Sequence, residues 1–233
     1  MTAPFPAAAL KSAAQTPLIL AVPKGRILVE CGPLLARAGI RPDDDYADDD
    51  SRRLRFGTDD PMLDVVRVRP FDVATFVAFG GAQIGICGAD VLMEFDYPEI
   101  YAPLDLGIGA CRVSVAELSS MAGQDDPRLW SSVRVATKYP AIARRHYAAR
   151  GVHAEVVHLN GAMELAPGLG LARVIVDLVQ TGSTLRANGL EEVEVIAPVT
   201  SRLIVNRTAL KTRPDEVGAL IARFAQALRQ VAA

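Results

Sequence analysis

The chain is long enough to bury one large hydrophobic core or two modest ones, because it has 233 residues and half of them are hydrophobic. Charged residues make up 22% of the chain, a share typical of a globular protein and not of a disordered one. The 25 basic and 27 acidic side chains nearly cancel, so the net charge of −2 gives no overall attraction to nucleic acid.

The N-terminal segment and the cysteines indicate the compartment. Residues 1–16 are rich in alanine and proline, and their only basic residue, Lys11, follows the apolar stretch, unlike an export signal. We predict a flexible arm there. The three cysteines are odd in number and widely spaced, which argues against a disulfide framework and against a zinc site. No apolar run approaches the roughly 18 to 20 residues of a membrane span. We therefore predict a cytoplasmic protein without membrane contact.

Strands and helices alternate in the first half of the chain. Short apolar runs predict strands at 18–22, 63–68 and 84–87, and helical spacing predicts helices at 27–38 and 70–80. Gly88-Ala89-Asp90 leads into a further helix. The segment 43–50 holds six aspartates and predicts a solvated loop. Residues 104–116 are apolar and marked by glycines, and we predict two extended segments that cross between lobes.

The alternation restarts near residue 110. We predict strands at 133–137, 154–159, 174–176 and 192–205, with a helix at 140–150 and a short helix that begins at 181–184. The tail forms an amphipathic helix whose apolar face holds Val217, Leu220, Ile221, Phe224, Leu228 and Val231. The pattern predicts two α/β lobes, each a mainly parallel sheet flanked by helices, with the first formed by 17–107 plus 200–233 and the second by 108–199.

The segment after the 174–176 strand carries the chemistry. The strand delivers Asp177, and a loop with Thr181, Gly182, Ser183 and Thr184 then opens a helix. Free backbone N–H groups at a helix start bind anions, glycine permits close approach, and small hydroxyls add donors. Asp177 is placed to accept hydrogen bonds from ribose hydroxyls. This pattern favours a phosphate ester, although a plain strand–turn–helix with Thr or Ser as its N-cap is the alternative.

Asp177 to Leu185 resembles the phosphoribosyl pyrophosphate loop of phosphoribosyltransferases, and the longer sequence is similar to ATP phosphoribosyltransferase. Four segments agree in order: Pro23-Lys24-Gly25-Arg26; Ala82 to Leu92; Leu104 to Gly107 with Cys111-Arg112; and Glu164 to Leu190. The resemblance implies a fold like that of periplasmic binding proteins, with the active site in the cleft between the lobes.

The resemblance also implies a reaction and its residues. N1 of ATP displaces pyrophosphate from phosphoribosyl pyrophosphate, the first step of histidine biosynthesis, with Mg²⁺ on the pyrophosphate and no direct protein ligand assigned to the metal. The residues implied as catalytic are Lys24, Arg26 and Arg52, although Arg53 and Arg55 leave the choice of the third open. Those implied to bind phosphoribosyl pyrophosphate are Glu164, Asp177, Gln180, Thr181, Gly182, Ser183 and Thr184. Lys24, Gly88 and Asp90 are candidates for ATP, with a helix-capping role as the alternative for Asp90.

The resemblance is to the short form of the family, since the chain ends after its tail helix. That form implies a homodimer and a regulatory subunit similar to histidyl-tRNA synthetase. Two positions depart from the family pattern: Arg173 stands where many members have an acidic residue, and Ala89 where many have lysine. The alternatives are a catalytically weakened member, a phosphoribosyltransferase for another base, and a non-catalytic solute-binding protein of similar fold.

Overall fold

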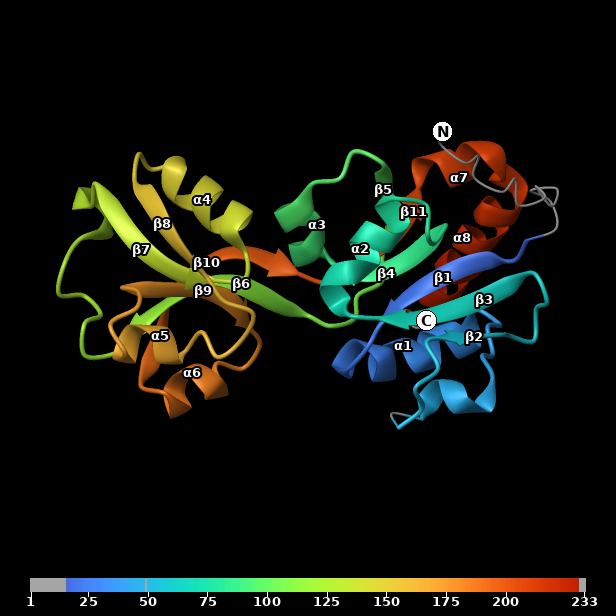
Figure 1. The fold of residues 1–233 in the computed structure, drawn as a ribbon, viewed down its shortest axis with the longest axis horizontal. Helices are drawn as coiled ribbons and strands as arrows, with labels where there is room; N and C mark the ends of the chain where they lie inside the picture. The colour runs from blue at the N-terminus through green and yellow to red at the C-terminus, as the bar shows by residue number, and fades with distance from the viewer. Residues whose placement is uncertain (1–15, 49, 231–233) are drawn as a thin grey trace, which may run out of the picture. The chain divides into compact units, whose positions relative to one another are not determined.

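The computed structural model describes residues 16–48 and 50–230, which form two compact units (Figure 1). Unit 1 comprises the described residues up to Cys87, Tyr97–Leu106 and those from Arg202 onward, and unit 2 comprises Gly88–Asp96 and Gly107–Ser201. Residues 1–15 of the predicted arm and Val231 of the predicted tail helix lie outside the described residues.

Unit 1 is built on a six-stranded sheet with the order β2-β3-β1-β4-β11-β5. The apolar strand β1 (Leu18–Pro23) lies inside it, parallel to β3 (Leu63–Val68) and β4 (Ile84–Gly88). Antiparallel pairs stand at both edges, where β2 (Arg55–Phe56) joins β3 and β5 (Ile100–Asp105) joins β11 (Ser201–Asn206).

The helices of unit 1 bury the apolar faces that their spacing predicts. Contacts join α1 (Arg26–Arg37) to α8 (Pro214–Arg229), the predicted tail helix, and α8 to α7 (Arg207–Thr212). Val217, Leu220 and Phe224 of α8 are buried, as an amphipathic helix requires. Helix α2 (Pro70–Ala78) approaches the sheet closely at Gly85, where an added Cβ would lie 2.8 Å from Val77.

Unit 2 is built on a five-stranded sheet with the order β10-β6-β9-β7-β8. Strand β7 (Ser132–Thr137) is parallel to β8 (His153–His158) and β9 (Val174–Val179), whereas β6 (Cys111–Leu118) is antiparallel to β9 and to β10 (Leu190–Val199). Helix α4 (Pro140–Ala148) covers one face, and α5 (Leu165–Gly168) and α6 (Ser183–Ala187) cover the other (Figure 1).

The α/β class and the two lobes are confirmed, but both sheets are mixed and not mainly parallel. The segment 192–205, predicted as one strand, forms parts of two strands, β10 and β11. Strand β10 pairs antiparallel with β6 in the sheet of unit 2, and β11 pairs antiparallel with β5 in the sheet of unit 1. Periodicity alone shows that such a segment is extended and does not show which neighbour it pairs with.

The segment Gly88–Asp96, predicted in the first lobe, groups with unit 2 through helix α3 (Ala89–Phe95). The Tyr139 hydroxyl donates to the buried Asp90 carboxylate at 2.6 Å. Glu94 accepts from the first backbone N–H groups of α4, at Ala141 and Ile142, at 2.8 and 3.0 Å. A carboxylate at a helix N-terminus satisfies N–H groups that the helix itself cannot. These polar contacts between α3 and α4 are the physical reason why Gly88–Asp96 groups with unit 2 and not with unit 1.

Candidate functional site

The predicted phosphate loop joins β9 to α6 in unit 2 (Figure 1). Strand β9 continues through Asp177 to Val179, further than predicted, so Asp177 lies within the strand. Gly182 adopts the left-handed conformation with a φ of 71°, which residues with a Cβ rarely adopt, and it is the N-cap of α6. The local backbone therefore explains the glycine at this position.

The loop offers hydrogen-bond donors to solvent. Gln180, Thr181, Ser183 and Thr184 are exposed. Among the described residues, none accepts a hydrogen bond from the backbone N–H of Gly182, Thr184 or Leu185. The Thr181 and Ser183 hydroxyl oxygens lie 3.0 Å apart. Because these donors converge on one short turn, the loop is suited to a group with several acceptor oxygens, such as a phosphate.

Arg112 on β6 supports the start of the loop. Its guanidinium donates to the Gln180 carbonyl at 3.1 Å and forms a bidentate ion pair with Glu192 of β10. The Ser114 hydroxyl donates to the same carboxylate at 2.6 Å. These bonds tie β6 and β10 to the first residue of the loop, so Arg112, quoted above only as part of a motif, has a positioning role here.

Two carboxylates lie beside the loop. The Lys138 ammonium, at the end of β7, is 3.6 Å from the Asp177 carboxylate. Burial raises the pKa of the Asp177 carboxyl above its usual value and the charge of Glu164 adds to that shift, whereas Lys138 and the Leu178 N–H oppose it. Lys138 is not among the residues predicted from the sequence. A lysine directly after a strand that is parallel to β9 is nevertheless a readable signal, since the ends of parallel strands meet at one sheet edge.

The predicted catalytic cations all belong to unit 1. Lys24 and Arg26 are exposed where β1 gives way to α1, and Arg26 lies 3.4 Å from Glu30. Of the three arginines left open by the sequence, Arg53 pairs with Asp43 and Asp45 at 3.1 Å and Arg55 with Asp64 at 2.6 Å. Arg52 is exposed and forms no ion pair with a described residue. It is therefore the one with a guanidinium available for a ligand.

Gly88 and Asp90, the tentative ATP residues, lie at the start of α3 in unit 2. Asp90 is buried, with one carboxylate oxygen engaged by Tyr139, and it forms no side-chain cap with the helix. The Asp90 carboxylate folds back so closely that a Cβ at Gly88 would lie 2.0 Å from it. The geometry favours a structural role for both residues.

Arg173, the first departure from the family pattern, belongs to a structural cluster. Its guanidinium contacts Glu117 at 3.1 Å and Asp125 at 2.9 Å and lies 5.7 Å from the centre of the Trp130 ring. Burial raises the pKa of the Glu117 carboxyl, and Arg173 opposes that shift. The Trp130 indole N–H donates to the Asp125 carboxylate at 3.1 Å, so Trp130 and Arg173 both contact the segment that follows β6. Arg173 thus balances buried charge and anchors a loop.

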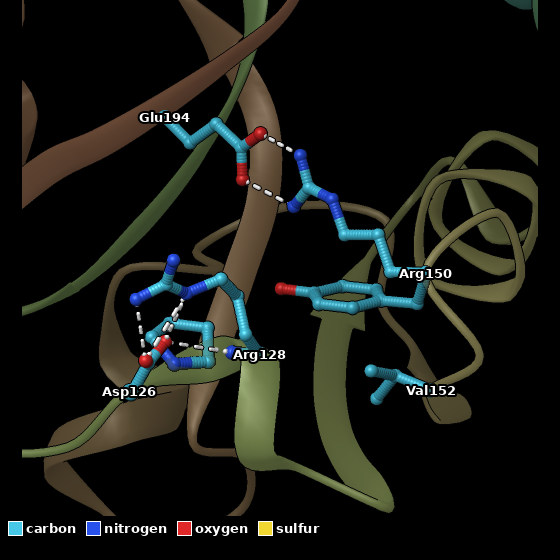
Figure 2. A pocket seen from close by; sticks show the side chains of 7 residues that line it. Asp126, Arg128, Arg150, Val152 and Glu194 are labelled. Carbon is cyan, nitrogen blue, oxygen red and sulfur yellow. Dashed lines mark hydrogen bonds and ion pairs between the residues drawn. The ribbon is translucent and has the colours of Figure 1, made fainter.

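A separate cavity of about 360 Å³ lies on unit 2 (Figure 2). Its charged residues are already paired, Arg150 with Glu194 and Arg128 with Asp126. None of the predicted site residues lines it. Since its charges are mutually neutralised, it does not compete with the loop as the anion site.

The part of the chain that the structure describes contains no group of three or more His, Cys, Asp or Glu side chains arranged to hold a metal ion. His146 packs edge-on against Tyr147, and burial lowers its pKa. Within the same described residues, no helix combines the length and the apolar character that a membrane crossing requires.

The fold and the loop together define the class, a two-lobed α/β protein whose second unit presents a loop suited to a phosphate ester. The family model described as ATP phosphoribosyltransferase matches residues 69–228. The chain belongs to the ATP phosphoribosyltransferase family, a family of pentosyltransferases.

Known proteins support this assignment over most of the chain. An ATP phosphoribosyltransferase from Gluconobacter oxydans is 71% identical, over 91% of this chain and 88% of that protein. One from Paramagnetospirillum magneticum is 67% identical, over 91% of this chain and 97% of that protein.

Two solved structures agree on the fold. A chain of the ATP phosphoribosyl transferase (HisG:HisZ) complex from Thermotoga maritima matches with a TM-score of 0.77 at 30% identity, over 91% of this chain and 99% of that one. The BvgS VFT2 domain from Bordetella pertussis matches with a TM-score of 0.57 at 13% identity, over 93% of this chain and 88% of that one, which shows the fold alone. The second match agrees with the periplasmic-binding-protein-like fold that the resemblance implied.

Proposed function

We propose that this chain transfers the phosphoribosyl group of phosphoribosyl pyrophosphate to N1 of ATP and releases pyrophosphate, the first step of histidine biosynthesis. Family membership supports the reaction. The observation that carries the site is the exposed turn 180–184, whose N–H groups at Gly182 and Thr184 have no partner among the described residues. In this proposal the turn binds the 5′-phosphate, and Asp177 and Glu164 accept hydrogen bonds from the ribose hydroxyls.

The chemistry asks for stabilised charge more than for a general base. Adenine N1 carries a free lone pair, so its attack on the anomeric carbon needs little proton removal. Negative charge grows on the departing pyrophosphate, and cations placed in advance stabilise it. We assign this role to Lys24, Arg26 and Arg52, which are all exposed in unit 1. Lys24 is also the proposed contact to the phosphates of ATP.

The residues present fit a magnesium ion held mainly by substrate. Mg²⁺ usually binds one or two carboxylates together with phosphate oxygens and water. Glu164 and Asp177 are close enough for the charge of one to raise the pKa of the other, and they would hold the ion. When bound, Mg²⁺ supplies further neutralisation of the leaving pyrophosphate.

We also propose that the chain works as a homodimer in the cytoplasm, with a regulatory subunit similar to histidyl-tRNA synthetase. The Thermotoga maritima match, from a HisG:HisZ complex, supports a hetero-oligomer. Cys31, Cys87 and Cys111 form no disulfide bond among the described residues, which supports a reducing compartment.

An assay for phosphoribosyl-ATP tests the proposed reaction. The protein would be incubated with phosphoribosyl pyrophosphate and labelled ATP, orotate or free purines, with and without a histidyl-tRNA-synthetase-like protein. We expect product from ATP alone among these acceptors. Transfer to another base would show a different phosphoribosyltransferase, and ligand binding without turnover in either condition would favour a solute-binding protein.

Lys138→Met tests the proposed role of Asp177. Removing the ammonium that opposes the effect of burial should raise the pKa of Asp177 further. Because the ionised carboxylate accepts from the ribose hydroxyls, the acidic limb of phosphoribosyl pyrophosphate binding should move to higher pH. Affinity measured across the acidic range reports this shift. Lys211→Met, on helix α7, is the control. An acidic limb that coincides with that of the unchanged protein would remove Asp177 from ribose binding.

A further inference from the structure

Arg67 on β3 is a buried cation whose two terminal guanidinium nitrogens donate to one segment of the chain. It is 2% exposed. One terminal nitrogen donates to the carbonyls of Tyr46 and Asp48 at 2.8 and 2.9 Å, and the other to those of Ser51 and Arg53 at 3.3 and 3.4 Å. Its backbone N–H donates to the Leu54 carbonyl at 2.8 Å. One residue thus binds five carbonyls of the segment 46–54.

This arrangement is costly for a residue that only fills the core. Burying a guanidinium is unfavourable unless it is paired and hydrogen-bonded. Arg67 forms no ion pair with a described carboxylate, and its Nε is buried without a hydrogen-bond partner there. The compensation comes from the carbonyls and from the Phe56 ring, whose centre lies 4.7 Å away. The hydrogen bonds that compensate the buried charge therefore also fix the backbone conformation of this loop.

The loop is clamped on both sides of Arg52. The carbonyls of Ser51 and Arg53, which flank Arg52 in the chain, both accept from Arg67. Arg53 is fixed in turn by Asp43 and Asp45 at 3.1 Å. The aspartate-rich segment, predicted as a solvated loop, thus also braces Arg53. Arg52 remains as the exposed cation on a backbone held from both sides.

We propose that Arg67 is a positioning residue that holds residues 46–48 and 50–53 so that the Arg52 guanidinium is presented to the leaving pyrophosphate. This inference rests on the proposed function of Arg52. A preordered cation loses less conformational freedom when it stabilises developing charge. Because the side chain of Arg67 is buried, its effect on the reaction passes through Arg52 in this proposal.

Arg67→Lys separates this role from a merely structural one. Lysine keeps the charge, but a single ammonium cannot reach four separated carbonyls as a planar fork does. We expect faster amide hydrogen exchange confined to residues 46–54 and a single-turnover rate lowered about tenfold, with the KM for ATP unchanged. Arg69→Lys, two residues along the chain and exposed, is the control and should alter neither measurement.

A double-mutant cycle decides whether Arg67 acts through Arg52. We expect Arg52→Ala to lower the single-turnover rate. The double variant R52A/R67K should have the same rate as R52A alone, because Arg67 has no further effect on the reaction once the Arg52 guanidinium is absent. Multiplied effects in the double variant would overturn the proposal, and so would an unchanged rate in R67K with faster exchange. An unchanged rate in R52A would refute the role of Arg52 itself and with it the positioning role, whereas the exchange data would still report whether Arg67 orders the loop.

A second variant covers failure of R67K to fold. Arg53→Gln removes the brace on the other side of Arg52 without burying a new group, since Arg53 is exposed. It should loosen the same segment and lower the rate in the same direction, again without further loss in combination with R52A. Faster exchange at 46–54 with a wild-type rate would count against the proposal.

Discussion

Thr184→Leu is expected to weaken the binding of phosphoribosyl pyrophosphate by about 10- to 100-fold, the effect of losing one hydrogen bond to a charged group. Thr184 is exposed at the second position of α6, and its backbone N–H has no partner among the described residues. Leucine removes the hydroxyl donor and brings bulk to a turn that must approach a phosphate. Isothermal titration with phosphoribosyl pyrophosphate measures the change.

The chain offers a closely matched control at Thr208. This threonine is also exposed at the second position of a short helix, α7 in unit 1. Thr208→Leu makes the same chemical change away from the loop and should leave affinity unaltered. If both variants bind equally well while remaining folded, the turn after β9 is not the phosphate site and the proposed function loses its main structural support.

Arg26→Ala is expected to lower the rate of the chemical step by about 10²- to 10³-fold, the usual cost of removing one positioned donor from developing negative charge. Arg26 is exposed at the first position of α1, with Glu30 as its ion-pair partner at 3.4 Å. A surface pair of this kind contributes little to stability, so the variant should fold. Single-turnover kinetics isolate this step from product release.

Arg37→Ala provides the comparison on the same helix. Arg37 is exposed in the last turn of α1, at the opposite end from Arg26. We expect a normal single-turnover rate for this variant. Equal rates for the two variants would take Arg26 out of the mechanism, whereas a drop confined to phosphoribosyl pyrophosphate affinity would assign it to substrate binding.

Of the two departures from the family pattern, Arg173 has a structural explanation in this chain, whereas nothing in the structure explains alanine in place of lysine at position 89. Arg173 neutralises buried Glu117 and contacts Asp125. Ala89 begins α3 and donates its backbone N–H to the Thr200 carbonyl at 2.9 Å. Neither residue occupies the loop after β9. The product assay tests directly the alternative of a catalytically weakened member.

Local sequence was sufficient for several of the strands, for the tail helix and for the turn after β9, whose role in binding phosphate stays a prediction. Strands β1, β3, β7 and β9 are short apolar runs, and the amphipathic face of α8 is visible in its spacing, because burial imposes those periods along the chain itself. Gly182 and the hydroxyls around it form the turn through neighbouring backbone geometry. The burial of Arg67 could also have been predicted, since Arg67 follows Leu63 and Val65 on the buried face of an alternating strand.

Only the tertiary structure decided the strand pairs and ion pairs that join residues distant in the chain. The sequence by itself determined the α/β alternation, the loop and the set of candidate cations. The fold pairs Arg53 and Arg55 with carboxylates of other segments, which is why we propose Arg52 among the three arginines. It also separated β10 from β11 into different sheets and joined α3 to unit 2 through the Asp90–Tyr139 bond. Strand pairing and ion pairing are set by three-dimensional proximity, which a pattern along one chain does not encode.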